Sequence, residues 1–162
     1  MTQKVRTGIG YDIHRLDVGH RLVLGGIEIP FSRGLVGHSD GDVLVHAVID
    51  ALLGAMGDKD IGQCFPDTNP VYRNIQSTEL LVSVAIQLKQ RDYEVSNIDS
   101  IVVAEEPKLA PFIPAMKDIL CPILGLPVKD LGIKAKTREG LGDVGEGRAI
   151  AAWAVATIVS CS

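Results

Sequence analysis

The strongest constraint on the fold comes from the segment 39–56, which combines an aliphatic helical face with a line of polar residues. Leucine, valine and alanine side chains recur every three or four residues, at positions 44, 47, 48, 51, 52 and 55. This spacing predicts an amphipathic helix whose apolar face covers a core. Ser39, with Asp42 three residues later, forms a capping-box-like start, and Gly57 is a typical helix stop.

A polar stripe on this helix holds a histidine between two acids, which is poor material for a core. Asp42, His46 and Asp50 lie at steps of four residues and therefore project from one side of the helix. Near the N-terminus, Asp12 and His14 are two residues apart at the end of a predicted strand. Side chains alternate along a strand, so we expect these two to point to the same face.

Asp12, His14 and His46 together would leave one position of a tetrahedral metal site open, which is typical of catalytic zinc. A neighbouring acid on the helix stripe would orient the histidine. Two alternatives use the same residues. The first is a non-haem iron oxygenase, which also binds its metal with two histidines and one carboxylate. A binding module with a structural zinc would need a fourth ligand, and the sequence has no cysteine pair to supply it. The non-functional interpretation is a solvated helix face with a chance histidine.

The remaining pattern predicts a single α+β domain over residues 1–162, with helices on one face of a sheet. Strands are expected at 5–13, 98–104, 131–137 and 149–159, a hairpin with a Gly-Gly turn at 21–29, and helices at 39–56, 77–91 and 111–124. The segment 58–76 is rich in polar residues and contains two prolines, which predicts a long loop that acts as a lid.

Composition narrows the classes of partner. Aromatic residues make up only 4%, so the core must be aliphatic, which also fits an oligomer that buries strand or helix faces between subunits. The net charge is -4 with no basic run, so we expect no nucleic-acid partner. The longest apolar run, 149–159, is too short to span a membrane, and no targeting segment is evident. Cys64, Cys121 and Cys161 have no paired spacing, which favours reduced thiols and a cytoplasmic location.

Polar residues beside the predicted elements are candidates for binding phosphate. His38 and Ser39 precede the helix, whose N-terminal N–H groups attract anions; a loop histidine and a simple helix cap are the alternatives. Thr137, Arg138 and Glu139 end a strand next to glycines. A glutamate at this position suits Mg²⁺, which prefers one or two carboxylates together with phosphate oxygens, and a solvated glutamate is the alternative.

Two further loops have less specific sequences. Asp60-Ile61-Gly62 and Phe65-Pro66-Asp67 lie in the predicted lid, where ordinary turn chemistry also accounts for them. The segment 104–109 follows a strand and contains one cation. Exposed backbone near Pro107 would contact the edge of a base, and an ordinary strand-to-helix connection is the alternative.

Taken together, these segments resemble the 2-C-methyl-D-erythritol 2,4-cyclodiphosphate synthase family of the non-mevalonate isoprenoid pathway. The resemblance runs through essentially the whole chain. It is carried by Gly10-Tyr11-Asp12-Ile13-His14, His38-Ser39-Asp40-Gly41-Asp42, His46, Asp60-Ile61-Gly62, Phe65-Pro66-Asp67-Thr68, Pro107-Lys108 and Thr137-x-Glu139.

The resemblance implies a homotrimer of ferredoxin-like α+β subunits, each with a mixed sheet, and active sites between neighbouring subunits. It implies that 4-diphosphocytidyl-2-C-methyl-D-erythritol 2-phosphate is cyclised with release of CMP, the 2-phosphate attacking the β-phosphorus. Because the nucleophile is then part of the substrate, positioning carries much of the catalysis. A lid over 62–76 would exclude water, which competes with cyclisation.

The resemblance also implies roles for individual residues. Asp12, His14 and His46 match Zn²⁺ ligands, and Glu139 matches the ligand of a second ion, Mg²⁺ or Mn²⁺, on the diphosphate. His38 and Thr137 match residues that stabilise the transition state. The expected substrate-binding set is Asp12, Ile13, His14, His38, Ser39, Asp60, Ile61, Gly62, Phe65, Pro66, Asp67, Ala104, Pro107, Lys108, Leu109, Lys136, Thr137, Arg138 and Glu139. Within it, positions 60 and 62 match the methylerythritol pocket, and positions 104 and 107–109 match the cytidine pocket, which is completed across the subunit boundary.

Two positions depart from the family pattern. Arg73 stands where the lid often carries a lysine, so a cation is retained. The family commonly reads Arg-Gly-Glu here, and its arginine is assigned to phosphate binding at the trimer centre. In this chain the segment 145–148 reads Gly-Glu-Gly-Arg, so the acid and the arginine, Glu146 and Arg148, have exchanged places. An acid repels phosphate, and an unpaired buried charge is costly. We therefore expect Glu146 and Arg148 to pair with each other, within a subunit or across the threefold interface.

Overall fold

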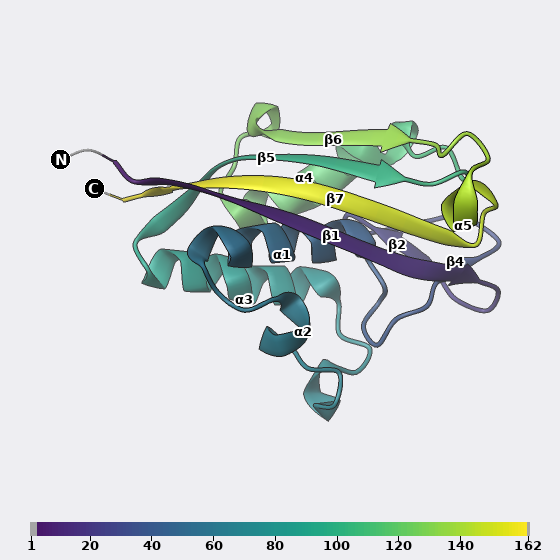
Figure 1. Ribbon diagram of the computed structural model, residues 1–162, viewed down its shortest axis with the longest axis horizontal. Coiled ribbons are helices and arrows are strands. Elements are labelled where there is room, and N and C mark those ends of the chain that lie inside the picture. Colours follow the sequence, from purple (N-terminus) through teal and green to yellow (C-terminus); the bar gives the residue numbers. More distant parts are fainter. Residues whose placement is uncertain (1–2, 162) are drawn as a thin grey trace.

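The aliphatic run near the C-terminus forms strand β7 (Ala149–Ser160), which lies inside the sheet with a neighbour on each side (Figure 1). The computed structural model describes residues 3–161. β7 pairs antiparallel with β1 (Val5–Asp17) and with β5 (Tyr93–Val103). A strand flanked on both sides pairs its backbone fully, which suits the nearly continuous burial of this segment.

The other elements extend the sheet and cover it. They are β2 (Leu22–Leu24), β3 (Ile27–Ile29), β4 (Gly34–Leu35), β6 (Leu131–Lys136), α1 (Val43–Met56), α2 (Ile61–Cys64), α3 (Ser77–Gln90), α4 (Ile113–Leu124), α5 (Gly142–Gly145) and the 3₁₀ turns η1 (Pro70–Tyr72), η2 (Ala110–Phe112) and η3 (Val128–Asp130). The sheet order is β4-β1-β7-β5-β6, and β2 and β3 form a separate hairpin. One core joins the inner face of the sheet to α1, α3 and α4, so the long helices lie on one face, as predicted.

The order of elements along the chain differs from the predicted ferredoxin-like arrangement. A ferredoxin-like chain runs β-α-β-β-α-β, whereas here helical crossovers follow β1 and β5, and β6 and β7 come last. β5 and β6 are parallel and are linked through α4, because parallel neighbours need a long connection. β7 then returns antiparallel between β1 and β5. The fold is thus α+β with a five-stranded mixed sheet, in a different order from the one expected.

Helix α1 lies unusually close to β1. A Cβ added to Gly8 would lie 2.0 Å from the carbonyl oxygen of Ala51, and Gly10 is placed in the same way against Ala47. No side chain fits at either position. Because glycine has no Cβ, the backbone of β1 can lie directly against the backbone of α1. This contact fixes the distance from α1 to the strand that carries Asp12 and His14.

The ends of β1 and α1 differ from the predictions. β1 continues to Asp17 instead of ending at Ile13, so the metal-binding motif lies within the strand. α1 begins at Val43, and its N-cap is Asp42 rather than Ser39. The Asp42 side chain accepts a hydrogen bond of 3.1 Å from the backbone N–H of Val45, which satisfies one of the free donors of the first turn.

The environment of α1 also differs from the expected one-sided burial. Within this helix, only Asp50 and Gly54 are more than slightly exposed, because α1 lies between the sheet, α3 and the lid. The lid contains α2 and η1, so the segment 58–76 is not all loop. The short elements β4 and α5 were not predicted, and β5 begins at Tyr93 rather than at residue 98.

The sheet face opposite the helices exposes apolar side chains near its middle. Ile9 is 71% exposed, and Tyr11 and Val155 are exposed beside it. Ile9 is paired with Val155 in the register of β1 and β7, and Tyr11 stacks at an angle on Trp153. Within residues 3–161, no helix is long and apolar enough to cross a membrane.

Candidate metal site and adjoining pockets

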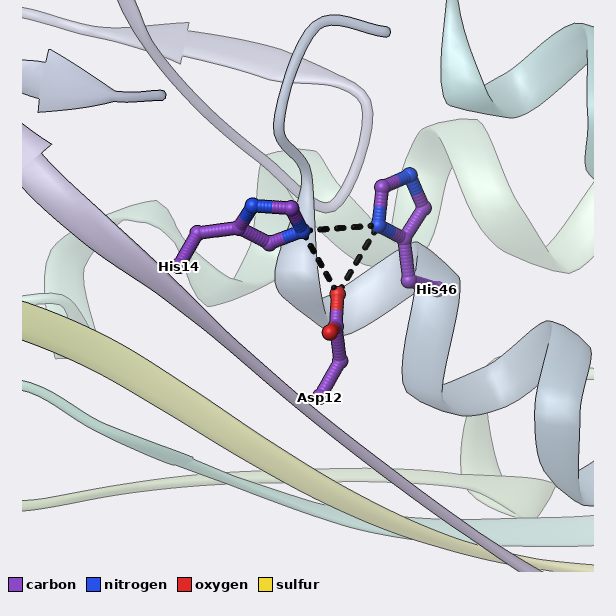
Figure 2. A group of neighbouring side chains, drawn as sticks. All are labelled: Asp12, His14 and His46. Carbon is purple, nitrogen blue, oxygen red and sulfur yellow. Dashed lines mark hydrogen bonds and ion pairs between the residues drawn. The ribbon is translucent and has the colours of Figure 1, made fainter. Parts of the chain in front are cut away.

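Asp12, His14 and His46 converge on one point (Figure 2). The Oδ2 atom of Asp12 lies 2.9 Å from Nε2 of His14 and 2.8 Å from Nδ1 of His46. The two nitrogen atoms are 3.3 Å apart. Alternation along β1 places Asp12 and His14 on the side facing the helices, and α1 presents His46 to them. The convergence predicted from residue spacing is therefore confirmed.

The three ligand atoms suit a tetrahedral divalent metal ion. Zinc bonds of about 2.0–2.2 Å to nitrogen and oxygen place neighbouring ligand atoms about 3.3 Å apart. The separations here, 2.8 to 3.3 Å, are close to that value. One carboxylate and two imidazoles leave a fourth position for water or a substrate oxygen, as in catalytic zinc sites.

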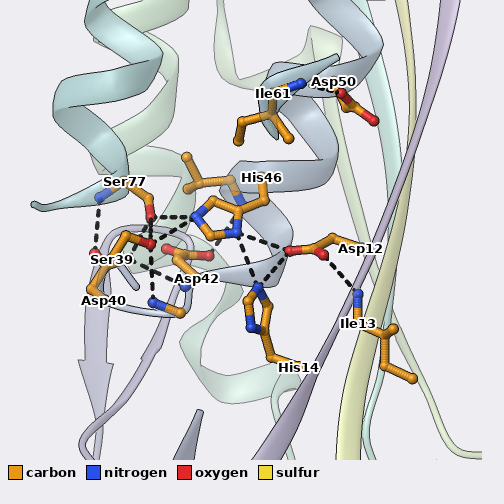
Figure 3. A network of polar contacts seen from close by, with 12 residues as sticks. Asp12, Ile13, His14, Ser39, Asp40, Asp42, His46, Asp50, Ile61 and Ser77 are labelled. Atoms are coloured by element: carbon orange, nitrogen blue, oxygen red, sulfur yellow. Dashed lines mark hydrogen bonds and ion pairs between the residues drawn. The ribbon is translucent and has the colours of Figure 1, made fainter. Parts of the chain in front are cut away.

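The outer nitrogen of each imidazole is held by a second group, and Figure 3 shows this for His46. Nδ1 of His14 lies 2.8 Å from the carbonyl oxygen of Val36, which can only accept a hydrogen bond. Nε2 of His46 lies 2.8 Å from Oγ of Ser77 and 3.1 Å from Oγ of Ser39. Each ring therefore presents its other nitrogen toward Asp12, which is the orientation that shared metal binding requires.

The charges of the cluster stabilise an ionised Asp12. Burial alone would raise the pKa of this carboxyl, but hydrogen bonds and charge interactions with His14 and His46 outweigh burial and hold the pKa well below its usual range. Burial would lower the pKa of His14, but the hydrogen bond and charge of Asp12 prevail and raise it. A bound cation would replace this proton as the partner of Asp12.

The two acids of the helix stripe have other roles than orienting His46. Asp42 is fully buried and accepts hydrogen bonds from the backbone N–H groups of Gly25 at 3.0 Å and Gly26 at 2.8 Å, so it joins the β2–β3 hairpin to α1. Burial, followed by the charge of Asp40, raises the pKa of Asp42 to about 6, against these hydrogen bonds. Asp50 accepts a hydrogen bond of 2.9 Å from the N–H of Ile61, which attaches the lid helix α2. The expectation that a stripe acid orients His46 was wrong.

A pocket of about 220 Å³ opens beside the candidate metal site. Its walls contain Asp12, His14, His38, Ser39, His46, Ile61, Gly62, Phe65 and Asp67 from the predicted set, together with Tyr72, Ile75 and Leu80, which were not predicted. Asp60 is the N-cap of α2 and accepts a hydrogen bond from the N–H of Gln63 at 3.0 Å. The lid thus lies over the metal residues and supplies apolar walls around them.

A second pocket, of about 190 Å³, lies where β5 and β6 end. It is lined by Ala104, Pro107, Lys108, Leu109, Lys136 and Thr137 from the predicted set, with Glu105, Ala110 and Ala135. In the described part of the chain, this pocket shares no lining residue with the pocket at the metal site. The predicted nucleotide-binding and metal-binding residues therefore form two separate surfaces within one chain.

Five predicted residues are not in the lining of either pocket: Ile13, Asp60, Pro66, Arg138 and Glu139. Asp60 and Pro66 lie in the lid, next to residues that do line the metal pocket. Ile13 is 43% exposed on the sheet face opposite the helices, because it alternates with Asp12 and His14, although its N–H donates to Oδ1 of Asp12 at 2.9 Å. Arg138 borders a different hollow, beside Tyr11 and Trp153 on the open face of the sheet. Glu139 has a left-handed backbone, with φ of 53°, and its carboxylate accepts a hydrogen bond of 3.3 Å from Thr137.

Glu146 and Arg148 pair within one chain, as expected from their exchanged positions. Arg148 also donates from Nε to Asp143 at 3.0 Å, so one guanidinium bridges two carboxylates at the end of β1. These hydrogen bonds and charges raise the pKa of Arg148 and keep it cationic. Two acids already neutralise this arginine, which leaves it less charge for an anionic ligand.

Ser77 and Asp40 are functional candidates that sequence reasoning did not single out. Ser77 is fully buried at the start of α3, and its hydroxyl reaches His46, a residue far away in the sequence. A serine at a helix start is an ordinary capping residue, so its local sequence carries no signal of this contact. Asp40 lies in a motif that was noted, but the partner of its carboxylate depends on the tertiary fold.

The fold and the site define an α+β enzyme with a candidate metal site under a lid. The chain belongs to the YgbB family, which it matches over residues 5–159. It is 50% identical over 153 residues to the 2-C-methyl-D-erythritol 2,4-cyclodiphosphate synthase of Caldicellulosiruptor bescii, a match that covers 94% of this chain and 98% of the relative. It is 56% identical over 154 residues to the bifunctional enzyme IspD/IspF of Desulforudis audaxviator, covering 95% of this chain and only 39% of that relative.

The solved structures agree with the sequence relatives. The CDP complex of IspF from Plasmodium falciparum superimposes with a TM-score of 0.87 at 30% identity and covers 100% of both chains. The relatives are named after the formation of 2-C-methyl-D-erythritol 2,4-cyclodiphosphate in isoprenoid synthesis. The comparisons support the same activity for this chain. The chain spans well under half of the bifunctional relative, so the second activity of that enzyme is not carried over.

Proposed function

We propose that Asp12, His14 and His46 hold a catalytic Zn²⁺ at which 4-diphosphocytidyl-2-C-methyl-D-erythritol 2-phosphate is cyclised with release of CMP. The observation that carries this proposal is the convergence of one carboxylate oxygen and two imidazole nitrogens beside a pocket. A bound zinc would supply Lewis-acid charge that offsets the attacking and transferring phosphates. Within the described residues, the lining of the metal pocket contains no lysine or arginine to do so.

The residues around the metal would position the substrate and keep water out. His38 and Ser39 line the metal pocket and would donate hydrogen bonds to phosphate oxygens. Asp60, Ile61 and Gly62 at the start of α2 would bind the methylerythritol hydroxyl groups, with the 65–67 segment beside them. Because the nucleophile belongs to the substrate, holding the two phosphorus groups in line can supply roughly 7–11 kcal/mol of the barrier reduction.

The second pocket would bind the cytidine diphosphate part of the substrate. Its Lys108 and Lys136 bring positive charge to a pocket with apolar walls. Thr137 would stabilise the transition state, and Glu139, held beside it by a hydrogen bond, would bind Mg²⁺ or Mn²⁺ on the diphosphate. The related IspF of Plasmodium falciparum was solved as a complex with CDP, which supports a cytidine nucleotide as the ligand.

We propose that the active enzyme is a homotrimer in which one subunit supplies the metal pocket and its neighbour the nucleotide pocket. The two pockets share no lining residue within residues 3–161, so one subunit presents two half-sites. The open sheet face with Ile9, Tyr11 and Val155 supplies apolar surface for the contact between subunits. We also propose that residues 1–162 form a single domain, of which residues 1, 2 and 162 lie outside the described part. The free cysteines fit a cytoplasmic location, which is the last part of the proposal.

Incubation with the cytidylyl substrate tests the function. The unchanged enzyme should release CMP and form the cyclic diphosphate, also without O₂, which separates it from an oxygenase. His46→Ala should lose both product formation and bound zinc. His20→Ala, a matched change at an exposed histidine, should keep both. Absence of the cyclic product, or full activity of His46→Ala, would contradict the proposal. Sedimentation of Ile9→Asp, which should dissociate the trimer, tests the assembly.

A further inference from the structure

Ser77 makes the shorter of the two serine contacts to the outer nitrogen of His46. Its hydroxyl oxygen lies 2.8 Å from Nε2 of His46 and is fully enclosed by protein. The other ring nitrogen, Nδ1, faces Asp12 and His14. When Nδ1 binds a metal ion, the neutral imidazole carries its proton on Nε2, so this N–H donates to Ser77.

Asp40 fixes the hydroxyl of Ser77 in turn. Because Ser77 accepts from His46, its own proton must go to another acceptor, and Oδ1 of Asp40 is in direct hydrogen-bond contact with it (Figure 3). Oδ2 of Asp40 accepts from the backbone N–H of Ser77 at 3.0 Å, and Oδ1 also accepts from the N–H of Asp42 at 3.2 Å. The hydrogen bonds therefore run in one direction, from His46 through Ser77 to a carboxylate that is held at both oxygens.

We propose that Ser77 and Asp40 are positioning residues that set the orientation and basicity of His46 as a metal ligand. This inference rests on the proposed zinc site. A carboxylate at the end of such a chain polarises the imidazole through the hydroxyl and strengthens its bond to the metal. The arrangement is unlike that of His14, whose outer nitrogen meets only the neutral carbonyl of Val36.

Ser39 is the competing explanation for the orientation of His46. Its hydroxyl lies 3.1 Å from Nε2 of His46, and it is partly exposed on the wall of the metal pocket. Ser77 is closer, more deeply buried and backed by Asp40, so its hydroxyl is the fixed acceptor. The other contacts of the Ser39 hydroxyl, to Oγ of Ser77 and the N–H of Gly41, are both long at 3.4 Å, so Ser39 is the serine that can turn toward a ligand in the pocket.

Zinc affinity, measured by competition with a chromophoric chelator, tests the inference without relying on activity. Ser77→Ala and Asp40→Asn should each weaken zinc binding by about 10- to 100-fold, the usual cost of losing a group behind a metal ligand. Ser77→Thr, which keeps the hydroxyl, should recover most of the affinity. Ser83→Ala, a change at an exposed serine on the same helix, should leave it unchanged. The double variant at positions 40 and 77 should bind zinc no more weakly than Ser77→Ala, because the two act as one unit.

Nuclear magnetic resonance of the zinc-loaded protein provides a second measurement, whose first part uses only the unchanged protein. The Nε2–H proton of His46 should be visible and protected from exchange in the unchanged protein, and should lose protection in Ser77→Ala. If zinc binding is lost in His46→Ala but unchanged in both Ser77→Ala and Asp40→Asn, the relay is wrong while the zinc site stands. If the unchanged protein and His46→Ala bind zinc equally, the zinc site itself is wrong. An exchanging Nε2–H proton in the unchanged protein would also overturn the relay.

Discussion

Gly10 and Ala47 are in main-chain contact, since a Cβ built on Gly10 would lie 1.9 Å from the carbonyl oxygen of Ala47. Gly10 precedes Asp12 on the same face of β1, and Ala47 follows His46 on α1. The separation between the two imidazoles and the carboxylate is therefore set by contact between backbones, with no side chain between them. Any group added at this contact must move the helix that carries His46.

Gly10→Ala should destabilise the protein and weaken metal binding together. The added methyl group meets backbone that cannot rotate away, so we expect a loss of at least about 2 kcal/mol in the free energy of unfolding. Urea unfolding and zinc competition measure the two effects. Gly54→Ala is the matched control on α1, because its Cβ would meet Gly8 only at 3.8 Å and alanine favours helix. Equal zinc affinity in Gly10→Ala and the unchanged protein would show that α1 does not set the ligand spacing.

Asp42→Ala should reduce the free energy of unfolding by roughly 2–5 kcal/mol. The change removes the N-cap of α1 and leaves the N–H groups of Gly25 and Gly26 without their acceptor. Asp60→Ala removes a comparable cap from an exposed four-residue helix and should cost much less. Denaturant unfolding of both variants decides the matter, and similar midpoints would refute a special role for Asp42.

Zinc affinity should fall as the pH is lowered, because a protonated imidazole cannot bind metal. The raised pKa of His14 means that the loss begins above the ordinary histidine value of 6.5. The metal-free protein should show the opposite trend. The pair of His14 with Asp12 contributes stability below pH 6.5, and this contribution is lost as the pH rises through the raised pKa. Chelator competition and metal-free unfolding, each measured from about pH 5 to pH 8, test both signs. Parallel trends in the two experiments would argue against this ion pair.

Glu139→Gln should weaken the dependence on Mg²⁺ or Mn²⁺ and lower turnover while leaving zinc in place. The amide keeps the hydrogen bond from Thr137 but lacks the charge that binds a hard cation. Titration of activity with each metal, alongside zinc content, separates the two ions. Glu106→Gln, a change at an exposed acid outside the lining of the proposed nucleotide pocket, is the control. Superimposable metal titrations for Glu139→Gln and the unchanged enzyme would remove Glu139 from the proposed site.

The metal cluster was predicted from local geometry in two separate segments, which the ligand pattern and the family resemblance then joined into one site. Alternation in β1 places Asp12 beside His14, and a helix stripe presents His46. The place of β7 between β1 and β5 was missed, because a strand pattern does not specify its neighbours. The full burial of α1 was also missed, although Gly8 and Gly10 on the inner face of β1 were an available signal of close packing. Ser77 was missed because its partner lies outside its own stretch of sequence.

The C-terminal end of the lid is hydrogen-bonded to the segment that contains Asp40. The N–H of Asn74 donates to the carbonyl of His38 at 2.9 Å, and the N–H of Asp40 donates to the carbonyl of Ile75 at 3.2 Å. Through Ser77, the same aspartate reaches the ligand His46. We therefore expect metal occupancy and closure of the lid to be thermodynamically linked, and such linkage is reciprocal. A protease that cuts the lid would be slowed by zinc, and a substrate that closes the lid would make the zinc harder to remove.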